Sequence, residues 1–365
     1  RISMKKIKYL QAHFFTTFFI LCSIILFFPT IQSQAYEYND DIVVIDGVSY
    51  EYRSGYAYLY DLPAGQGQGD ITVHNKIVYK GKEYKINFFA WANDEISSPF
   101  YVPKKLKGSQ KSANSYYQLL KKITIEKGIR PIDTAHNYQN LEEVVFEDSE
   151  YISDVNFNNC PKLKNLYIPK NVQKFPLIFR CNSLKVTIAP DNPYLKVVNG
   201  DVYSKNGRTL YKVFSKKKNY KVKSSVKKIS TYAFSGNDFI KSIKMGNNVK
   251  KVSDFCFADM ANLKTLKLSK SLKSVPLLAI ALTPKFKTIT FPSNVKSITK
   301  TYGYMWMAGP DTSPYKAKKI YIQTRNLKNS SLKYFSKKST IYVKNSSVRK
   351  QVQKSGFKGK IIIKK

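Results

Sequence analysis

Apolar residues return along the second half of the chain at a fixed spacing. A five-residue motif similar to Asn-Val-Lys-Lys-Val occurs four times, with its first apolar residue at Val226, Val249, Leu272 and Val295. Each interval is 23 residues. A unit of this length cannot bury its apolar side chains alone, so neighbouring units must stack and share one core. The pattern therefore predicts a solenoid of repeated coils.

A second set of apolar positions keeps the same spacing and predicts the form of each coil. It is a Leu-x-x-Leu-x-Leu ladder, at Ile240/Ile243/Met245, Leu263/Leu266/Leu268 and Phe286/Ile289/Phe291. A fixed period of about 20–29 residues with this ladder is typical of a leucine-rich repeat. Alternate strand residues face opposite ways. We therefore expect Leu266 and Ile289 to be buried and Lys267 to be exposed.

A further ladder of apolar positions includes aromatic residues that resemble a binding patch. Its members are Ala233-Phe234, Cys256-Phe257 and Ala279-Ile280. Phe88-Phe89-Ala90-Trp91 aligns with it. We therefore expect these aromatic side chains in the core.

The N-terminal 35 residues have the pattern of an export signal. Lys5, Lys6 and Lys8 precede an apolar run from Phe14 to Phe28, and Ser33-Gln34-Ala35 supplies small residues for cleavage. This arrangement predicts a signal peptide over residues 1–35, cleaved after Ala35, with no stable membrane span in the mature chain. The alternative is a retained membrane anchor, since the run is near the lower length for a span.

Local spacing predicts the remaining organisation. We expect an N-terminal β cap and loop over residues 36–118, repeats over 119–298, an aromatic insertion loop over 299–319 and a basic C-terminal cap over 320–365. The repeats contain a degenerate coil near Val186/Ile188. They are interrupted at about 190–221, where Asn199-Gly200 and Asn206-Gly207 predict a β-hairpin. The fold class is thus a strand-dominated α/β leucine-rich repeat solenoid with two caps and an inserted hairpin.

Three stretches of the sequence match the sequence pattern of a known repeat. They are Asn248-Val249-Lys250-Lys251-Val252 followed by Asn262-Leu263-Lys264-Thr265-Leu266-Lys267-Leu268, then Tyr232-Ala233-Phe234-Ser235-Gly236, and the hairpin beginning Asp191-Asn192-Pro193-Tyr194. They resemble the BspA-type leucine-rich repeat of bacterial cell-surface proteins, and the resemblance covers roughly residues 41–300. It implies a secreted or surface-associated protein that binds other macromolecules, often as an adhesin. It implies no catalytic residue.

Positive charge increases steeply along the chain, from a mixed N-terminal part to an almost purely basic C-terminal part. The formal net charge is +38. Residues 36–155 carry 13 basic and 18 acidic side chains, residues 156–259 carry 21 and 5, and residues 260–365 carry 24 and one, Asp311. Such a gradient favours attraction to polyanions. The alternative is a lysine-rich surface that keeps an exported protein soluble.

Two groups of residues are candidates for ligand contact. Lys264, Lys267 and Lys287 should lie in rows on stacked coils, where an anionic cell-wall polymer would contact them. Tyr302, Tyr304 and Trp306 lie outside the repeat register, so they are candidates for contact with a protein or polysaccharide partner. Packing of this aromatic group onto the C-terminal cap is the alternative. Export and the lack of a recognised module argue against a nucleic-acid partner.

The sequence offers no signature of catalysis, of a cofactor or of a metal site. His74 and His136 are far apart, and Gly65-Gln66-Gly67-Gln68-Gly69 precedes a strand-like segment, whereas a dinucleotide loop precedes a helix. Cys160 and Cys181 occupy the same slot of adjacent repeats, which leaves open a disulfide or two inert buried thiols. Two functions remain: a secreted or cell-surface protein for macromolecular binding or adhesion, and a wall-associated structural protein held by charge.

Overall fold

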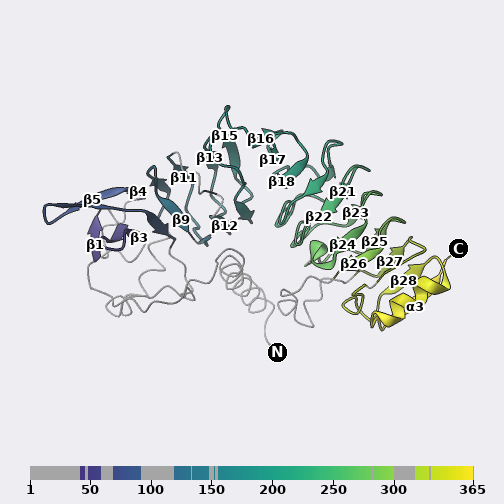
Figure 1. Cartoon of the computed structure of the whole chain (residues 1–365). Coiled ribbons are helices and arrows are strands. Elements are labelled where there is room, and N and C mark those ends of the chain that lie inside the picture. Colours follow the sequence, from purple (N-terminus) through teal and green to yellow (C-terminus); the bar gives the residue numbers. More distant parts are fainter. Residues whose placement is uncertain are drawn as a thin grey trace. The chain divides into compact units, whose positions relative to one another are not determined.

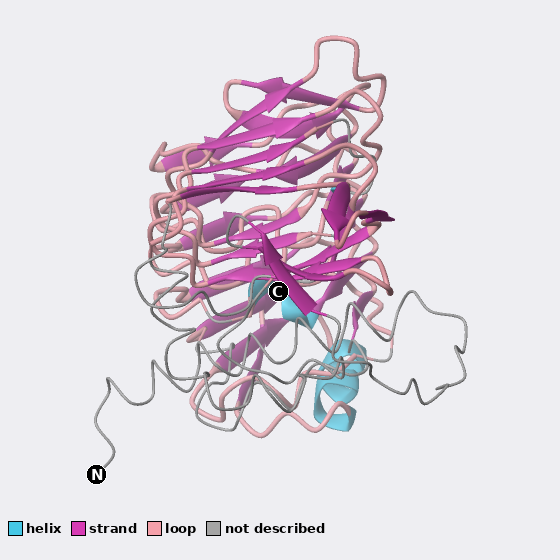
Figure 2. Ribbon diagram, turned by 90° about the vertical axis from the view of Figure 1, so that its left-hand side faces the viewer, coloured by secondary structure: helices cyan, strands magenta, loops and turns pink. Residues whose placement is uncertain are grey.

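The chain forms two compact units of stacked β-coils. The computed structural model describes residues 42–45, 48–58, 69–91, 119–132, 134–147, 152, 155–281, 283–299, 317–328 and 330–364. Unit 1 comprises Arg1–Pro193 and unit 2 comprises Tyr194–Lys365. In each unit, short strands from successive coils lie side by side and form sheets (Figures 1 and 2).

Unit 2 carries a sheet, here called the front sheet, to which each successive coil adds one strand. All neighbouring strands in it are parallel and pair in register. In spatial order they are β19 (Asn219–Lys221), β21 (Ser242–Lys244), β23 (Thr265–Lys267), β25 (Thr288–Phe291), β27 (Lys319–Ile322), β28 (Thr340–Val343) and β29 (Lys360–Ile363).

The other strands of unit 2 form two smaller sheets. The first begins with antiparallel pairs and continues with parallel ones, in the order β16 (Leu195–Val198), β17 (Asp201–Ser204), β18 (Thr209–Lys212), β20 (Lys228–Ile229) and β22 (Lys251–Val252). The second pairs β24 (Ser274–Pro276) with β26 (Ser297–Thr299), and the 3₁₀-helix η3 (Leu277–Ile280) follows β24 directly.

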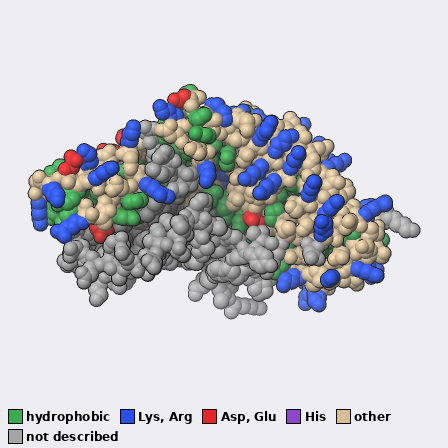
Figure 3. Space-filling model, in the orientation of Figure 1, with side chains coloured by type: hydrophobic (Ala, Val, Ile, Leu, Met, Phe, Trp, Pro, Cys, Tyr) green, Lys and Arg blue, Asp and Glu red, His purple; other side chains and the backbone are tan. Residues whose placement is uncertain are grey.

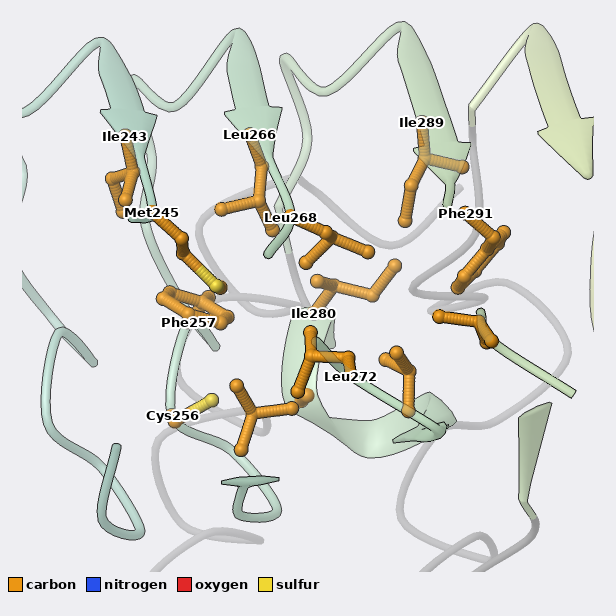
Figure 4. Packing of buried hydrophobic residues seen from close by; sticks show 14 of the residues in the cluster. Ile243, Met245, Cys256, Phe257, Leu266, Leu268, Leu272, Ile280, Ile289 and Phe291 are labelled. Atoms are coloured by element: carbon orange, nitrogen blue, oxygen red, sulfur yellow. The ribbon is translucent and has the colours of Figure 1, made fainter. Parts of the chain in front are cut away.

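The sheets of unit 2 enclose one apolar core that runs from coil to coil (Figure 4). Ile243, Leu266 and Ile289 come from successive strands of the front sheet and point inward, towards Phe257 and Ile280. The exposed fraction is 4% for Leu266 and 0% for Ile289, whereas Lys267 is exposed. The predicted alternation and the repeat solenoid are confirmed.

The hairpin of unit 2 shows how turn residues set local structure. β16 and β17 pair antiparallel around Asn199-Gly200, whose φ angles are 54° and 84°. These positive values suit a two-residue hairpin turn, and they explain why Asn-Gly occupies it. β18 then pairs in parallel with β20. The chain therefore returns to the coil arrangement before residue 221.

The C-terminal residues of unit 2 extend the front sheet. β27, β28 and β29 continue the parallel register, with Ile320 opposite Ile341 and Ile341 opposite Ile361. The segment predicted as a cap therefore contributes further coils to the same sheet. It also contains α3 (Ser346–Lys354), a helix that the sequence reading did not anticipate. Asn345 caps α3, because its side-chain oxygen accepts a hydrogen bond from the Val348 amide at 2.8 Å.

Unit 1 has the same construction. Its longest run of parallel coil strands is β4 (Asp70–Val73), β8 (Lys122–Ile125), β11 (Glu143–Phe146), β13 (Asn165–Ile168) and β15 (Lys185–Ile188). A second set is β10 (Thr134–His136), β12 (Asn156–Asn158) and β14 (Leu177–Phe179). The coil near Val186 that looked degenerate pairs in full register with β13.

The N-terminal part of unit 1 mixes hairpins with coil strands. One sheet has the order β1 (Ile42–Ile45), β2 (Val48–Glu51), β3 (Tyr56–Tyr58), β7 (Phe88–Ala90) and β9 (Arg130–Ile132). A separate antiparallel hairpin joins β5 (Lys76–Tyr79) to β6 (Lys82–Lys85). β4 and β7 already pair in parallel with coil strands, within the segment for which the sequence predicted a cap. Phe89 and Trp91 are buried, as expected, whereas Phe88 is only partly buried.

Cys160, Cys181 and Cys256 are buried and form no disulfide. Burial raises the pKa of the Cys160 and Cys256 thiols well above its ordinary value. A thiol that resists ionisation is a poor nucleophile and metal ligand. Of the two readings that the sequence left open for Cys160 and Cys181, this structure shows the one without a disulfide.

Candidate polyanion-binding face

Lysines on the front sheet of unit 2 form a column across successive coils. The column comprises the residue immediately before each strand, namely Lys218, Lys241, Lys264, Lys287 and Lys318. The backbone aligns them, because the Lys241 amide donates to the Lys218 carbonyl at 2.7 Å and the Lys264 amide donates to the Lys241 carbonyl at 2.8 Å. The Lys318 amide donates to the Lys287 carbonyl at 2.8 Å. All five side chains are exposed. We call this set the lysine column.

A second set of residues crosses the same sheet within the strands. The strand register places opposite one another Lys221, Lys244, Lys267, Thr290, Tyr321, Tyr342 and Ile362. We call this set the register row. It occupies the outward positions, because the alternating residues Ile243, Leu266 and Ile289 are buried. Its first three members are exposed lysines.

Nothing in the described part of unit 2 neutralises these lysines. None of the eight lysines in the column and the row takes part in an ion pair with a described residue. From Tyr194 to Lys365 the sequence holds 39 basic and five acidic side chains. Figure 3 shows Lys and Arg side chains gathered over the coils of this unit. Like charges on neighbouring strands repel one another, so an anion that binds between them would reduce this repulsion.

The corresponding face of unit 1 is built differently, which makes it an internal comparison. There the residues that precede β8, β11 and β13 are Lys121, Glu142 and Lys164. Lys164 Nζ lies 2.7 Å from Glu142 Oε2, and Lys122 Nζ lies 3.3 Å from Glu143 Oε2. The hydrogen bond from Lys164 lowers the pKa of Glu142. The position before the strand therefore carries the Lys164–Glu142 pair in unit 1 and lysines alone, from Lys218 to Lys318, in the described coils of unit 2.

A further line of basic residues lies away from the front sheet. It comprises Arg208, Lys227 and Lys250, linked by backbone hydrogen bonds, and then Lys273, Lys296 and Lys328, linked in the same way. The side chains of Arg208, Lys250 and Lys273 are exposed, whereas Lys227 is partly buried. This second basic column extends the positive surface of unit 2 beyond one sheet.

The structure brings together the three lysines predicted for polyanion contact. Lys264 and Lys287 belong to the lysine column, and Lys267 lies in the register row beside them. The prediction missed Lys218 and Lys241, although both keep the spacing of 23 residues that Lys264 and Lys287 follow. Lys318 follows Lys287 by 31 residues, so only the register reveals it. Tyr302, Tyr304 and Trp306 lie outside the described residues.

A buried polar cluster in unit 2 stabilises the hairpin. Asp201 Oδ2 accepts a hydrogen bond from the Tyr220 hydroxyl at 2.6 Å, and its Oδ1 accepts from the Phe214 and Ser215 amides at 2.9 and 3.1 Å. Burial raises the pKa of Asp201 despite these donors, and burial together with the Asp201 charge raises that of Tyr220. Asp201 is 4% exposed and Tyr220 is 8% exposed, so the cluster has little room for a substrate.

The described residues contain neither a cluster of metal-ligating side chains nor a helix that could span a membrane. No group of three or more His, Cys, Asp or Glu side chains there could hold a metal ion. Among the same residues, no helix is long and apolar enough to pass through a bilayer.

The coils and their ladders define a class, a repeat protein built from stacked parallel strands. Residues 73–194 and 207–304 match the model of the BspA type leucine rich repeat region, in 6 copies. The chain belongs to this family. The match confirms the family that the sequence motifs indicated, and it includes residues from 73 onward that the sequence reading assigned to a cap.

Solved structures of similar architecture are distant in sequence. The crystal structure of the pneumococcal vaccine antigen PcpA is 17% identical, covers 89% of this chain and 99% of its own, and has a TM-score of 0.49. The structure of a leucine rich cell surface protein from Faecalibacterium prausnitzii A2-165 is 13% identical, covers 90% and 96%, and has a TM-score of 0.43. No curated protein matches the sequence significantly. The family assignment therefore depends on the repeat sequence itself.

Proposed function

We propose that this protein is exported and acts at the cell surface as a non-enzymatic binding protein, and that the front sheet of unit 2 is its contact face for an anionic polymer. The observation that carries the proposal is the lysine column, in which five exposed lysines are aligned by backbone hydrogen bonds and strand register and have no ion-pair partner among the described residues. Membership of the repeat family and the predicted signal peptide support the location.

The geometry suits a linear polyanion better than a small anion. Neighbouring strands of a sheet are about 4.8 Å apart, so the column presents positive charges at a regular short interval. A linear polymer can contact many of them at once and releases its condensed counterions as it does so. The electrostatic repulsion between neighbouring lysines is relieved in the same step. Affinity should therefore increase with polymer length and decrease steeply with salt.

The second candidate is specific adhesion to a protein or polysaccharide partner, which family membership supports. The two modes differ in their response to ionic strength. We would titrate the mature chain with a linear polyphosphate, as a model of an anionic wall polymer, and with isolated cell wall, at several salt concentrations. Electrostatic retention predicts binding to both that falls steeply with salt. Binding to wall that is indifferent to salt, with none to polyphosphate, would favour specific adhesion.

A further inference from the structure

Two stacked tyrosines lie in the register row on the same face as the lysines. Tyr321 and Tyr342 are directly opposite each other on β27 and β28. Their ring centroids are 4.7 Å apart and their planes are inclined by 13°, so the rings lie face to face. Ile320 and Ile341 beside them are 0% exposed and point inward. The alternation of side chains therefore places both tyrosines on the outer side of the sheet, where both are partly exposed.

The tyrosines continue the path of the lysines without a change of sheet. Along the register row Lys267 is opposite Thr290, and Thr290 is opposite Tyr321. Lys364 Nζ also lies 5.9 Å from the centroid of the Tyr321 ring. A polymer that follows the lysines across the front sheet thus meets two aromatic rings with a further positive charge beside them.

This combination selects among anionic polymers. A chain that carries charge alone gains nothing from an aromatic ring. A polymer whose units also contain rings can pack a ring face or edge against the tyrosines, since aromatic side chains present large, rigid contact areas. The residues that flank the register row are polar and can exchange hydrogen bonds with hydroxyl groups; they include Ser242, Thr265, Thr288 and Thr340.

We propose that the Tyr321–Tyr342 pair and the adjoining lysines form a binding site for an anionic polysaccharide, with sugar rings packed on the tyrosines and acidic groups facing Lys244, Lys267 and Lys364. The site rests on the proposed function, because the lysines must first attract a polyanion. It adds that the polymer is built of sugars. The hydroxyl-rich flank favours a glycan over a single-stranded nucleic acid, whose bases would also stack.

The test compares three polymers on the full mature chain. An alginate oligosaccharide supplies carboxylates on sugar rings, linear polyphosphate supplies charge without rings, and oligothymidylate supplies charge with aromatic bases. We expect Tyr321→Ala or Tyr342→Ala to weaken alginate binding about fivefold, a typical effect of losing one aromatic contact. Polyphosphate affinity should change by less than about twofold in the same variants, because charge contacts remain.

Matched variants separate recognition from folding. Tyr342→Phe keeps the ring stack and should bind alginate like the parent chain. Tyr167→Ala removes an outward tyrosine, 44% exposed, at the equivalent strand position of unit 1, and should leave binding unchanged. If Tyr321→Ala lowers the melting temperature strongly, Tyr321→Leu retains apolar cover on the sheet and still removes the aromatic face.

The outcomes distinguish this inference from the proposed function. Binding of polyphosphate with no tyrosine effect on alginate would overturn the polysaccharide site and leave the lysine face intact. Equal losses of affinity for alginate and for polyphosphate in the tyrosine variants would show that the tyrosines only support the structure of the face. Preference for oligothymidylate with the same tyrosine dependence would indicate nucleic acid. If no polyanion binds the parent chain, the proposed function fails and the site fails with it.

Discussion

At the scale of single residues, the core is defined by side chains that repeat at one position of every coil. Leu266 lies between Ile243 and Ile289, its neighbours on the adjoining strands, and all three belong to the same buried core (Figure 4). Truncating a buried leucine leaves a cavity that stacked coils cannot close fully. We expect Leu266→Ala to lower the free energy of unfolding by about 2–5 kcal/mol. Lys267→Ala, the adjacent exposed position, is the control and should change it by less than about 0.5 kcal/mol. Urea unfolding followed by circular dichroism measures both, and equal stability of the two variants would contradict the packing described.

A second prediction at this scale concerns the buried carboxyl group of Asp201. Burial raises its pKa above the ordinary value of 3.8, so the folded chain holds the proton more tightly than the unfolded chain. The contribution of this group to stability is therefore complete below pH 3.8 and is lost as the pH rises through the folded pKa. Asp201→Asn does not titrate. The free energy of unfolding of the parent minus that of the variant should decrease from acid to neutral pH, because only the parent loses stability as Asp201 ionises. A value of this difference that is constant or increases with pH would show that the pKa of Asp201 is not raised.

At the scale of elements, the sequence was sufficient where the repeat spacing is constant and insufficient where it drifts. The interval of 23 residues predicts the strands around Ile243, Leu266 and Ile289 and their inward side chains, and all three residues are buried. β27, β28 and β29 follow one another at 21 and 20 residues. Strand pairing depends on backbone hydrogen bonds between neighbours, and the loops between strands can vary in length without disturbing it. A fixed period therefore underestimates the number of coils at both ends.

The candidate site shows the same division. Lys264, Lys267 and Lys287 could be predicted because they share the period. The Tyr321–Tyr342 pair could not, since the two residues lie beyond an insertion and only the register of β25, β27 and β28 brings them into line with the lysines. Helix α3 was missed for a related reason, because only Val348 and Val352 are buried in it and two apolar residues give too weak a period.

The cap of α3 gives a prediction for that element. Asn345 is the residue that satisfies a free amide at the start of the helix, with its oxygen 2.8 Å from the Val348 nitrogen. Asn345→Ala should cost about 1 kcal/mol of stability, the usual effect of losing such a cap. Ser347→Ala, an exposed position in the first turn, is the control and should be nearly neutral. Hydrogen exchange at the α3 amides reports the change locally, and equal protection in the two variants would rule out a capping role for Asn345.

At the scale of the whole molecule, the charge distribution carries the functional argument. Unit 1 pairs its charges across the strands that correspond to the front sheet, as Lys164–Glu142 and Lys122–Glu143 show. At the position before the strand, where unit 1 has the Lys164–Glu142 pair, unit 2 has the lysine column, which has no acidic partners among the described residues. One repeat architecture thus carries an internally neutralised face and a basic face. A coat that serves only solubility would not require the alignment of five lysines in one column.

The most direct test of this account is the salt dependence of polyanion binding as lysines are removed from the column. Lys241→Gln, Lys264→Gln and Lys287→Gln should each reduce the slope of log affinity against log salt by roughly 0.7–0.9 for linear polyphosphate, and the triple variant should reduce it by about three times as much. Lys76→Gln, Lys122→Gln and Lys164→Gln remove three lysines that are paired with acids in unit 1, and they form the matched control for equal loss of charge. The account predicts a graded loss for the unit 2 series and little change for the unit 1 series. Equal slopes in the two series would show that net charge alone governs binding and that the lysine column is not a site.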